Sequence, residues 1–393
     1  MSPTTVPQQI ALTEHQRRVV EGLTAEQALA LQATDAVSVT PTRRGYEITA
    51  KGLVGAVSLD GLQLHISPKV GIRRLLYLLG YATDQRWRDE DLPARADEDV
   101  VNAVATLLCW HTERALAGGI LQGYRRREEA ALTVRGRIRT SDQISRRFGL
   151  PIPVEVAYDD YDTDIDENRM LRTALRQIRQ LSGIDNATRQ RARRLHGLLC
   201  GASELPAGVV PEVRLTRRNQ RYASALFLAR LVLHQRSLDL ALGPAPAQAF
   251  LISMPAAFEA FLTTALSDAL RSHGGDTLAQ HTTTLHTAGA INVRPDLVWR
   301  HRGRVRAVID AKYKSLHGPT GPSGDMYQAL AYCIAHDLPR CWLVYAAGNE
   351  TPSRHTVRHL DATIHIATLD LTGNITDLHA DVRRLAADIA ETT

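Results

Sequence analysis

Residues 305–313 constrain the fold more than any other part of the chain. Their apolar and polar residues alternate, which is the two-residue period of a half-buried strand. On such a strand the apolar residues face one side, whereas Asp310 and Lys312 face the other. Residues two apart on a strand are separated by about 6.5 Å, so the carboxylate and the ammonium lie side by side. The chain is therefore expected to build a sheet that presents both groups on one face.

Three further polar side chains flank this strand in the sequence. Asp296 belongs to a second predicted strand over residues 291–299, whose apolar residues face away from it. Glu259 lies on a predicted helix before that strand, and Gln328 lies on a predicted helix after the first one. Since these elements follow one another closely along the chain, we expect their side chains to belong to one site.

This set of residues suits the hydrolysis of a phosphodiester. The carboxylates of Asp296, Asp310 and Glu259 are hard oxygen ligands, as Mg²⁺ prefers, with Mn²⁺ as an alternative. A bound metal lowers the pKa of its water and polarises the phosphate. Lys312 can orient that water or stabilise developing charge, and Gln328 is a further candidate. The order of elements is the one expected of the PD-(D/E)xK nuclease superfamily, whereas a surface ion pair between Asp310 and Lys312 is the structural alternative.

The remaining sequence predicts an α+β protein of two domains. At 393 residues the chain exceeds the size of one domain, which is about 150 residues. We expect a mixed helix and strand domain over residues 1–160 and a PD-(D/E)xK endonuclease domain, with a helical lead-in, over residues 161–393. The predicted elements are helices over 1–30, 71–81, 98–116, from 166 onward and over 220–235, short strands over 37–66 with a hairpin turn at Asp60-Gly61, and a strand over 131–138.

The amino-acid composition says less about the class of protein than the strand pattern does. No long apolar run predicts a membrane span, and the N-terminus has no secretory pattern. Four scattered cysteines suit a reducing compartment, so a cytoplasmic location is expected. The net charge of +5 weakly favours a polyanionic partner. Residues 122–147 hold eight arginines against three acids, which forms either a solvated face or a contact surface.

Short segments spread over most of the chain resemble the McrC family, the nuclease subunit of McrBC-type 5-methylcytosine-dependent (type IV) restriction systems. They occur in the family's order, which makes the resemblance more specific than the nuclease motif alone. Residues 1–35 have no counterpart in it. The matching segments are residues 64–69, 71–76, 124–125, 135–138, 158–161, 166–169, 258–259, 294–296, 310–314 and 325–328.

The resemblance implies a division of labour with a partner. The C-terminal half would cut double-stranded DNA, and the N-terminal half would dock onto a hexameric McrB-like AAA+ GTPase and stimulate its GTP hydrolysis. The sequence has no phosphate-binding loop of the G-x-x-x-x-G-K-[ST] type, so GTP would be bound by the partner. Arg135 or Arg137 is the candidate for reaching the partner's nucleotide site, because an arginine can stabilise a transferring phosphate.

Two other functions remain open from the sequence. The chain could be a non-catalytic adaptor that bridges a GTPase motor to DNA, which would require a damaged nuclease site. It could also be a stand-alone DNA repair nuclease without a motor partner.

Overall fold

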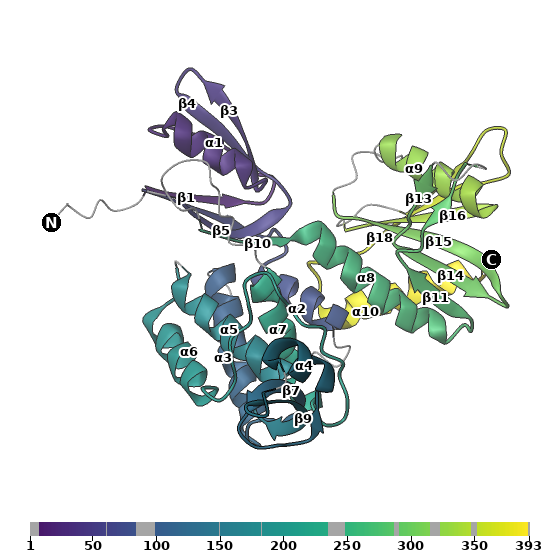
Figure 1. Cartoon of the computed structure of the whole chain (residues 1–393). Helices are drawn as coiled ribbons and strands as arrows, with labels where there is room; N and C mark the ends of the chain where they lie inside the picture. Colours follow the sequence, from purple (N-terminus) through teal and green to yellow (C-terminus); the bar gives the residue numbers. More distant parts are fainter. Residues whose placement is uncertain are drawn as a thin grey trace. The chain divides into compact units, whose positions relative to one another are not determined.

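The structure is a computed structural model with a mixed α+β architecture (Figure 1). Contacts divide the chain into a first unit, Met1–Ala103 with Leu238–Thr393, and a second unit, Val104–Ser237. Residue 160, near which the sequence predicts a domain boundary, lies inside β9 (Val154–Asp162) of the second unit, and β9 pairs along its whole length with an earlier strand. The residues described are 8–59, 61–83, 99–148, 150–181, 183–234, 248–286, 291–314, 323–346 and 352–391.

A six-stranded sheet forms the C-terminal part of the first unit. Its middle strands β15, β16 and β18 run parallel, and antiparallel strands extend it on both sides. In spatial order the strands are β11 (Asp276–Ala279), β14 (Leu297–His301), β15 (Arg304–Lys312), β16 (Arg340–Tyr345), β18 (Thr363–Thr368) and β17 (Ser353–Thr356). Strand β15 covers residues 305–312 of the strand that the alternation predicted over 305–313.

Helices pack on this sheet and bury its apolar residues. Helix α9 (Ser323–His336) shares a core with β15, β16 and β18, in which Leu343 and Tyr345 are fully buried. Helix α8 (Met254–Arg271) packs against β15, and α10 (Ile375–Glu391) packs against α8. Full burial of one large apolar side chain contributes about 1.5–3 kcal/mol, so this core holds the strand that carries Asp310 and Lys312 firmly in place.

The N-terminal part of the first unit contains two smaller sheets. The prediction of one helix over residues 1–30 is wrong: β1 and β2 precede the helix α1 (Ala25–Ala33), which begins after a capping box formed by Thr24 and Gln27. In β1 the exposed and buried residues alternate, and the strand pairs parallel with β6, a long-range partner that local periodicity does not show. One sheet has the order β1 (Gln8–Thr13), β6 (Leu62–Ser67), β5 (Leu53–Leu59) and β10 (Gln248–Ser253). The other has the order β2 (Arg17–Val20), β4 (Gly45–Ala50) and β3 (Val37–Thr42).

Several local predictions in this part are confirmed. Four short strands, β3 to β6, occupy residues 37–67. Strands β5 and β6 form the expected hairpin at Gly61, whose φ of +70° suits a glycine; Asp60 lies outside the described residues. Helices α2 (Ile72–Thr83) and α3 (Val100–Leu116) match the helices expected from the spacing of apolar residues.

The second unit combines helices with a three-stranded sheet. The strand expected over 131–138 is only partly right, because Gly136 has a φ of +67° and breaks it. The sheet order is β7 (Gly123–Ala131), β9 and β8 (Arg137–Ile138), with α4 (Thr140–Arg147) after β8. Helix α5 (Asp166–Gln180) begins where expected and packs against α6 (Asn186–Leu198), which was not predicted, and α7 (Ala223–His234), which follows the short 3₁₀ helix η2 (Gln220–Tyr222).

Among the described residues, no helix is both long and apolar enough to span a membrane.

Candidate active site at the end of strand β15

Asp310 and Lys312 lie on the same face of β15, as the alternation predicted. Asp310 aligns with Leu343 of β16, and Lys312 aligns with Tyr345, so both point into the side of the sheet that α9 covers. Asp310 is only 3% exposed. Its carboxylate forms an ion pair with the Lys312 ammonium. This pair is not the exposed surface bridge considered as the alternative, and burial makes its charges interact more strongly than they would in water.

Two residues of α9 join this pair into a closed ring of side chains. The Tyr332 hydroxyl donates to Oδ1 of Asp310 at 2.9 Å, and Nε2 of Gln328 donates to the Tyr332 hydroxyl at 2.7 Å. Nζ of Lys312 donates to Oε1 of Gln328 at 2.7 Å. Burial, followed by the charge of Asp310, raises the pKa of Tyr332, so the hydroxyl keeps its proton and remains a donor. The ring fixes the position of the Lys312 ammonium.

Asp296 lies beside this ring but not within a strand. The predicted strand over residues 291–299 is interrupted: β13 (Asn292–Val293) ends before Pro295, and β14 begins after Asp296. Proline cannot donate to a strand ladder, which favours the break. The carboxylate is held instead by a backbone group, because the Ala311 amide donates to Oδ2 of Asp296 at 2.7 Å. Asp296 and Asp310 are thus connected through one peptide unit of β15.

Burial raises the pKa of Asp296 to about 7, and repulsion by the charge of Asp310 adds to this shift. Repulsion by Glu259 raises the pKa further, whereas the Ala311 hydrogen bond and Lys312 lower it. A buried carboxylate whose ionisation is opposed by a neighbouring carboxylate is typical of functional sites.

Glu259 reaches the site through a residue that the sequence analysis missed. Nε2 of Gln280 donates both to Oε1 of Glu259 and, at 2.9 Å, to Oδ1 of Asp296. The backbone amide of Gln280 also donates to the backbone carbonyl of Asp296 at 3.0 Å. Gln280 has a φ of +52°, a left-handed conformation that costs a non-glycine residue energy. No sequence pattern around Gln280 indicates this role, because it depends on a loop that brings together residues from α8 and the start of β14.

The carboxylates of Asp296 and Asp310 fit a hard divalent cation in their chemistry. Oδ2 of Asp310 is buried, faces Lys312 in the ion pair and accepts no hydrogen bond from the described residues. A cation would also relieve the repulsion that raises the pKa of Asp296. In the described part of the chain, however, no three histidine, cysteine, aspartate or glutamate residues are grouped as metal ligands. Glu259 is held by Gln280, so the three acids do not form a ready cage.

Arg135 and Arg137 lie in the second unit, on either side of Gly136. Both side chains are exposed. The Arg135 guanidinium lies 5.3 Å from the centre of the Tyr158 ring. A Cβ added to Gly136 would come within 2.5 Å of the Ala157 carbonyl oxygen, so only glycine fits this turn. The glycine turn therefore has one exposed arginine on each side, Arg135 before it and Arg137 at the start of β8.

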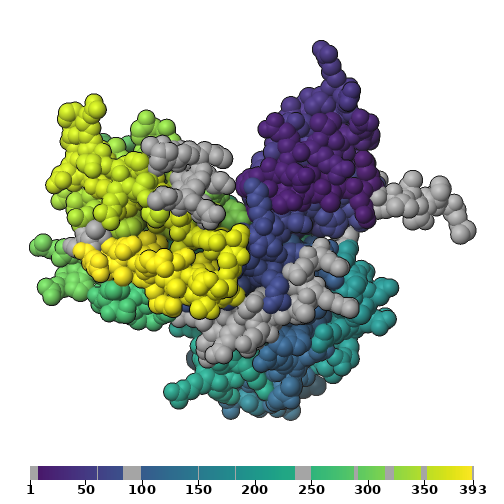
Figure 2. Space-filling view, turned by 180° about the vertical axis from the view of Figure 1, so that it is seen from behind, coloured from purple at the N-terminus to yellow at the C-terminus, as the bar shows by residue number. Residues whose placement is uncertain are grey.

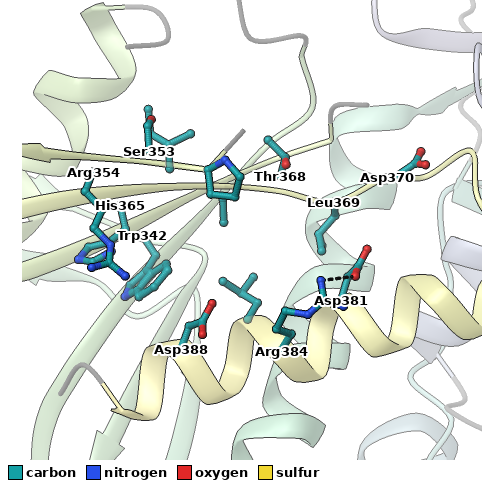
Figure 3. A pocket seen from close by; sticks show the side chains of 14 residues that line it. Trp342, Ser353, Arg354, His365, Thr368, Leu369, Asp370, Asp381, Arg384 and Asp388 are labelled. Atoms are coloured by element: carbon teal, nitrogen blue, oxygen red, sulfur yellow. Dashed lines mark ion pairs between the residues drawn. The ribbon is translucent and has the colours of Figure 1, made fainter. Parts of the chain in front are cut away.

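A cavity of about 420 Å³ lies on the opposite face of the six-stranded sheet. Trp342, which stacks on His365 at 4.3 Å, lines it, and Trp342 aligns with Ile309 rather than with Asp310. Figure 3 shows Asp381 and neighbouring charged residues of α10 facing these strands. The C-terminal residues, yellow in Figure 2, are visible at the surface from behind. None of the sequence-predicted site residues lines this cavity.

Comparison with known proteins gives the following matches. The model of a family described as McrBC 5-methylcytosine restriction system component matches residues 48–346, which is well over half of the chain. No curated protein matches the chain. Among solved structures, a chain of the refined half-complex from a tetradecameric assembly of Thermococcus gammatolerans McrB AAA+ hexamers with bound McrC has a TM-score of 0.62 at 18% identity, covering 97% of this chain and 100% of that chain. A chain of the Thermococcus gammatolerans McrBC complex has a TM-score of 0.44 at 18% identity, covering 67% and 88%.

Proposed function

This chain belongs to the McrBC 5-methylcytosine restriction system family, and we propose that it is the subunit that cuts DNA. The observation that carries the proposal is the closed ring that joins Asp310, Lys312, Gln328 and Tyr332 next to Asp296. Asp310 and Tyr332 are the buried members of this ring, and buried polar groups are costly unless they are satisfied. Its position where two carboxylates meet a lysine supports phosphodiester hydrolysis.

Each residue has a part in the proposed reaction. Asp296 and Asp310 would hold Mg²⁺, or Mn²⁺, which when bound neutralises phosphate charge and activates water. Lys312 donates hydrogen bonds from a position fixed by Gln328, so it can orient the attacking water or stabilise the charge that develops on the phosphate. Glu259 acts through Gln280, which joins it to Asp296, and is the third acid of the site.

The proposed layout is that of a PD-(D/E)xK nuclease domain. Glu259 on α8 precedes Asp296, which lies directly before β14, and Asp310-Ala311-Lys312 follow on β15. Helix α9 then supplies Gln328, and β16 pairs parallel with β15. This order matches the order expected from the sequence, and it supports the proposal of an endonuclease; double-stranded DNA is the substrate that the family resemblance implies.

We also propose that the chain works with an AAA+ GTPase. The solved structure that it resembles in fold is described as McrB AAA+ hexamers with bound McrC. The partner would bind GTP, since this sequence lacks a phosphate-binding loop. Arg135 and Arg137 on their fixed turn are the candidates for stimulating GTP hydrolysis by the partner.

The test is cleavage of methylated and unmethylated plasmid by the chain with its AAA+ partner, GTP and Mg²⁺. Asp310→Asn keeps the shape of the side chain and removes its charge, so it should abolish cleavage while GTP hydrolysis continues. Equal cleavage by wild type and Asp310→Asn would refute the site. Cleavage that needs neither partner nor GTP would favour a stand-alone nuclease.

A second candidate function is an adaptor that bridges the GTPase to DNA without cutting it. The observation that favours it is that no three potential metal-ligating side chains are grouped among the residues described. GTP hydrolysis and DNA binding without cleavage, in Mg²⁺ and in Mn²⁺, would support this candidate instead.

A further inference from the structure

Glu14 is a buried acid at the end of β1, far from the candidate site in sequence. The residue is 0% exposed. Oε1 accepts two hydrogen bonds, from the Lys69 backbone amide at 2.7 Å and from the Tyr313 hydroxyl at 2.7 Å. The other oxygen, Oε2, is buried and accepts no hydrogen bond from the described residues. One carboxylate oxygen therefore joins the N-terminal part of the first unit to the chain just after β15.

Tyr313 directly follows Lys312, and its ring lies against Phe258 of α8. The Tyr313 and Phe258 ring centres are 6.1 Å apart, and Phe258 precedes Glu259 on α8. The tyrosine thus lies between Glu14 and the helix that carries the third acid. The hydrogen bond from Tyr313 to Glu14 and the contact of its ring with Phe258 restrain the residue that directly follows Lys312 in the chain.

The residues on either side of Tyr313 have anchors of their own. Nζ of Lys314 donates to Asp325 at 2.8 Å, and the Tyr345 hydroxyl donates to the same carboxylate at 2.6 Å. The Lys312 carbonyl accepts from the Ala346 amide at 3.0 Å. These anchors come from α9 and the end of β16, whereas the anchor of Tyr313 comes from residue 14, 299 positions away.

A buried carboxylate with one oxygen left without a hydrogen bond is a poor way to gain stability. Removing a charge from water is costly, and a well-packed apolar residue in its place is often equally stable or better. The geometry of Glu14 is instead specific: it receives two donors at one oxygen, one from each part of the first unit. Buried polar groups of this kind can fix one arrangement of the parts that they join.

We propose that Glu14 is a positioning residue for the nuclease site, which holds Tyr313 and thereby fixes Lys312 beside Asp310. The inference rests on the proposed function. It gives residues 1–35, which the family resemblance does not cover, a part in the chemistry. It also explains why residues 64–69 and 310–314, two segments of that resemblance, meet at one side chain: Lys69 and Tyr313 both donate to Glu14.

The experiment measures single-turnover DNA cleavage by the full chain with its AAA+ partner, GTP and Mg²⁺. Glu14→Ala removes both acceptors and should lower the cleavage rate by roughly ten- to a hundredfold, since a small misplacement of a catalytic group has effects of that size. The protein concentration that gives half of the maximal single-turnover rate should not change, because Glu14 is 0% exposed and cannot contact DNA. Glu14→Gln keeps an acceptor oxygen and should restore most of the rate.

Leu12→Ala is the matched control for a purely structural role. Leu12 is 4% exposed and lies on β1, two residues before Glu14, so its truncation weakens the sheet that leads into Glu14 and leaves the acceptor of Tyr313 in place. Leu12→Ala should lower the melting temperature and leave the cleavage rate close to that of wild type. A loss of rate in Leu12→Ala equal to that in Glu14→Ala, or a normal rate in Glu14→Ala, would overturn the proposal.

Amide hydrogen exchange of residues 310–314 tests the positioning role of Glu14 independently of whether the chain cuts DNA. If wild type does not cut DNA, the nuclease assignment fails, and exchange still decides whether Glu14 fixes this segment. Faster exchange at residues 310–314 in Glu14→Ala, but not in Leu12→Ala, supports the positioning role. Unchanged exchange in Glu14→Ala overturns it.

Discussion

Replacing Tyr332 by phenylalanine removes a single oxygen from the ring that holds Lys312. That hydroxyl donates to Asp310 at 2.9 Å and accepts from Gln328 at 2.7 Å, and the tyrosine is only 1% exposed. The loss of a hydrogen bond to a charged group costs about 1.5–3 kcal/mol. Gln328 is exposed, so water can replace the bond that its amide loses. The Asp310 carboxylate, which is buried, has no such replacement.

We expect the Tyr332→Phe variant to cut DNA more slowly by about ten- to a hundredfold, because each 1.4 kcal/mol of lost transition-state stabilisation is a factor of about ten in rate. The KM for DNA should stay near the wild-type value, since the hydroxyl is buried. The assay is single-turnover cleavage with the AAA+ partner, alongside urea unfolding of the chain alone.

Tyr327→Phe is the control, because Tyr327 lies on the same helix but is 71% exposed. It should change neither the rate nor the unfolding free energy. A Tyr332→Phe variant that loses stability but cuts at the wild-type rate would show that the ring holds the fold together and does not position Lys312.

Three further predictions follow from the structure. The pKa of Asp296 is raised from its ordinary value of 3.8 to about 7, so ionisation of this carboxyl destabilises the folded state as the pH rises from 3.8 to 7, and Asp296→Asn should be more stable than wild type above pH 7 without metal. Asp296→Asn should also abolish any rise in melting temperature caused by Mg²⁺, and an equal rise in both proteins would argue against Asp296 as a ligand. Burial lowers the pKa of His365 from 6.5 to about 4, so between these pH values only the unfolded state takes up a proton, and the free energy of unfolding should fall by about 3 kcal/mol as the pH drops from 6.5 to 4. Urea titrations at each pH should show no such fall for His365→Phe, and the same pH dependence in the variant would contradict this prediction. Gly136→Ala should displace Arg135, because an alanine with a positive φ next to the Ala157 carbonyl oxygen is strained by about 1–3 kcal/mol. The rate of GTP hydrolysis by the partner should then fall, and an unchanged rate would argue against a role of this turn in stimulating the partner.

The sequence alone determined the parts of the site that lie on regular elements. The alternation along β15 placed Asp310 and Lys312 on one face, because the period of a strand is a local property of the backbone. The spacing of apolar residues placed Glu259 and Gln328 on helices in the same way. These predictions needed no knowledge of which elements meet in space.

Only the tertiary structure decided which groups those side chains touch. Tyr332 closes the ring, Gln280 joins two acids from a left-handed loop position, and Glu14 reaches Tyr313 across 299 residues. The helix expected over the first residues failed for the same reason, since β1 gains its hydrogen bonds from a parallel partner far along the chain. Periodicity reports the face that a residue takes within its own element, whereas hydrogen-bond partners depend on long-range packing, which has no local signature in the sequence.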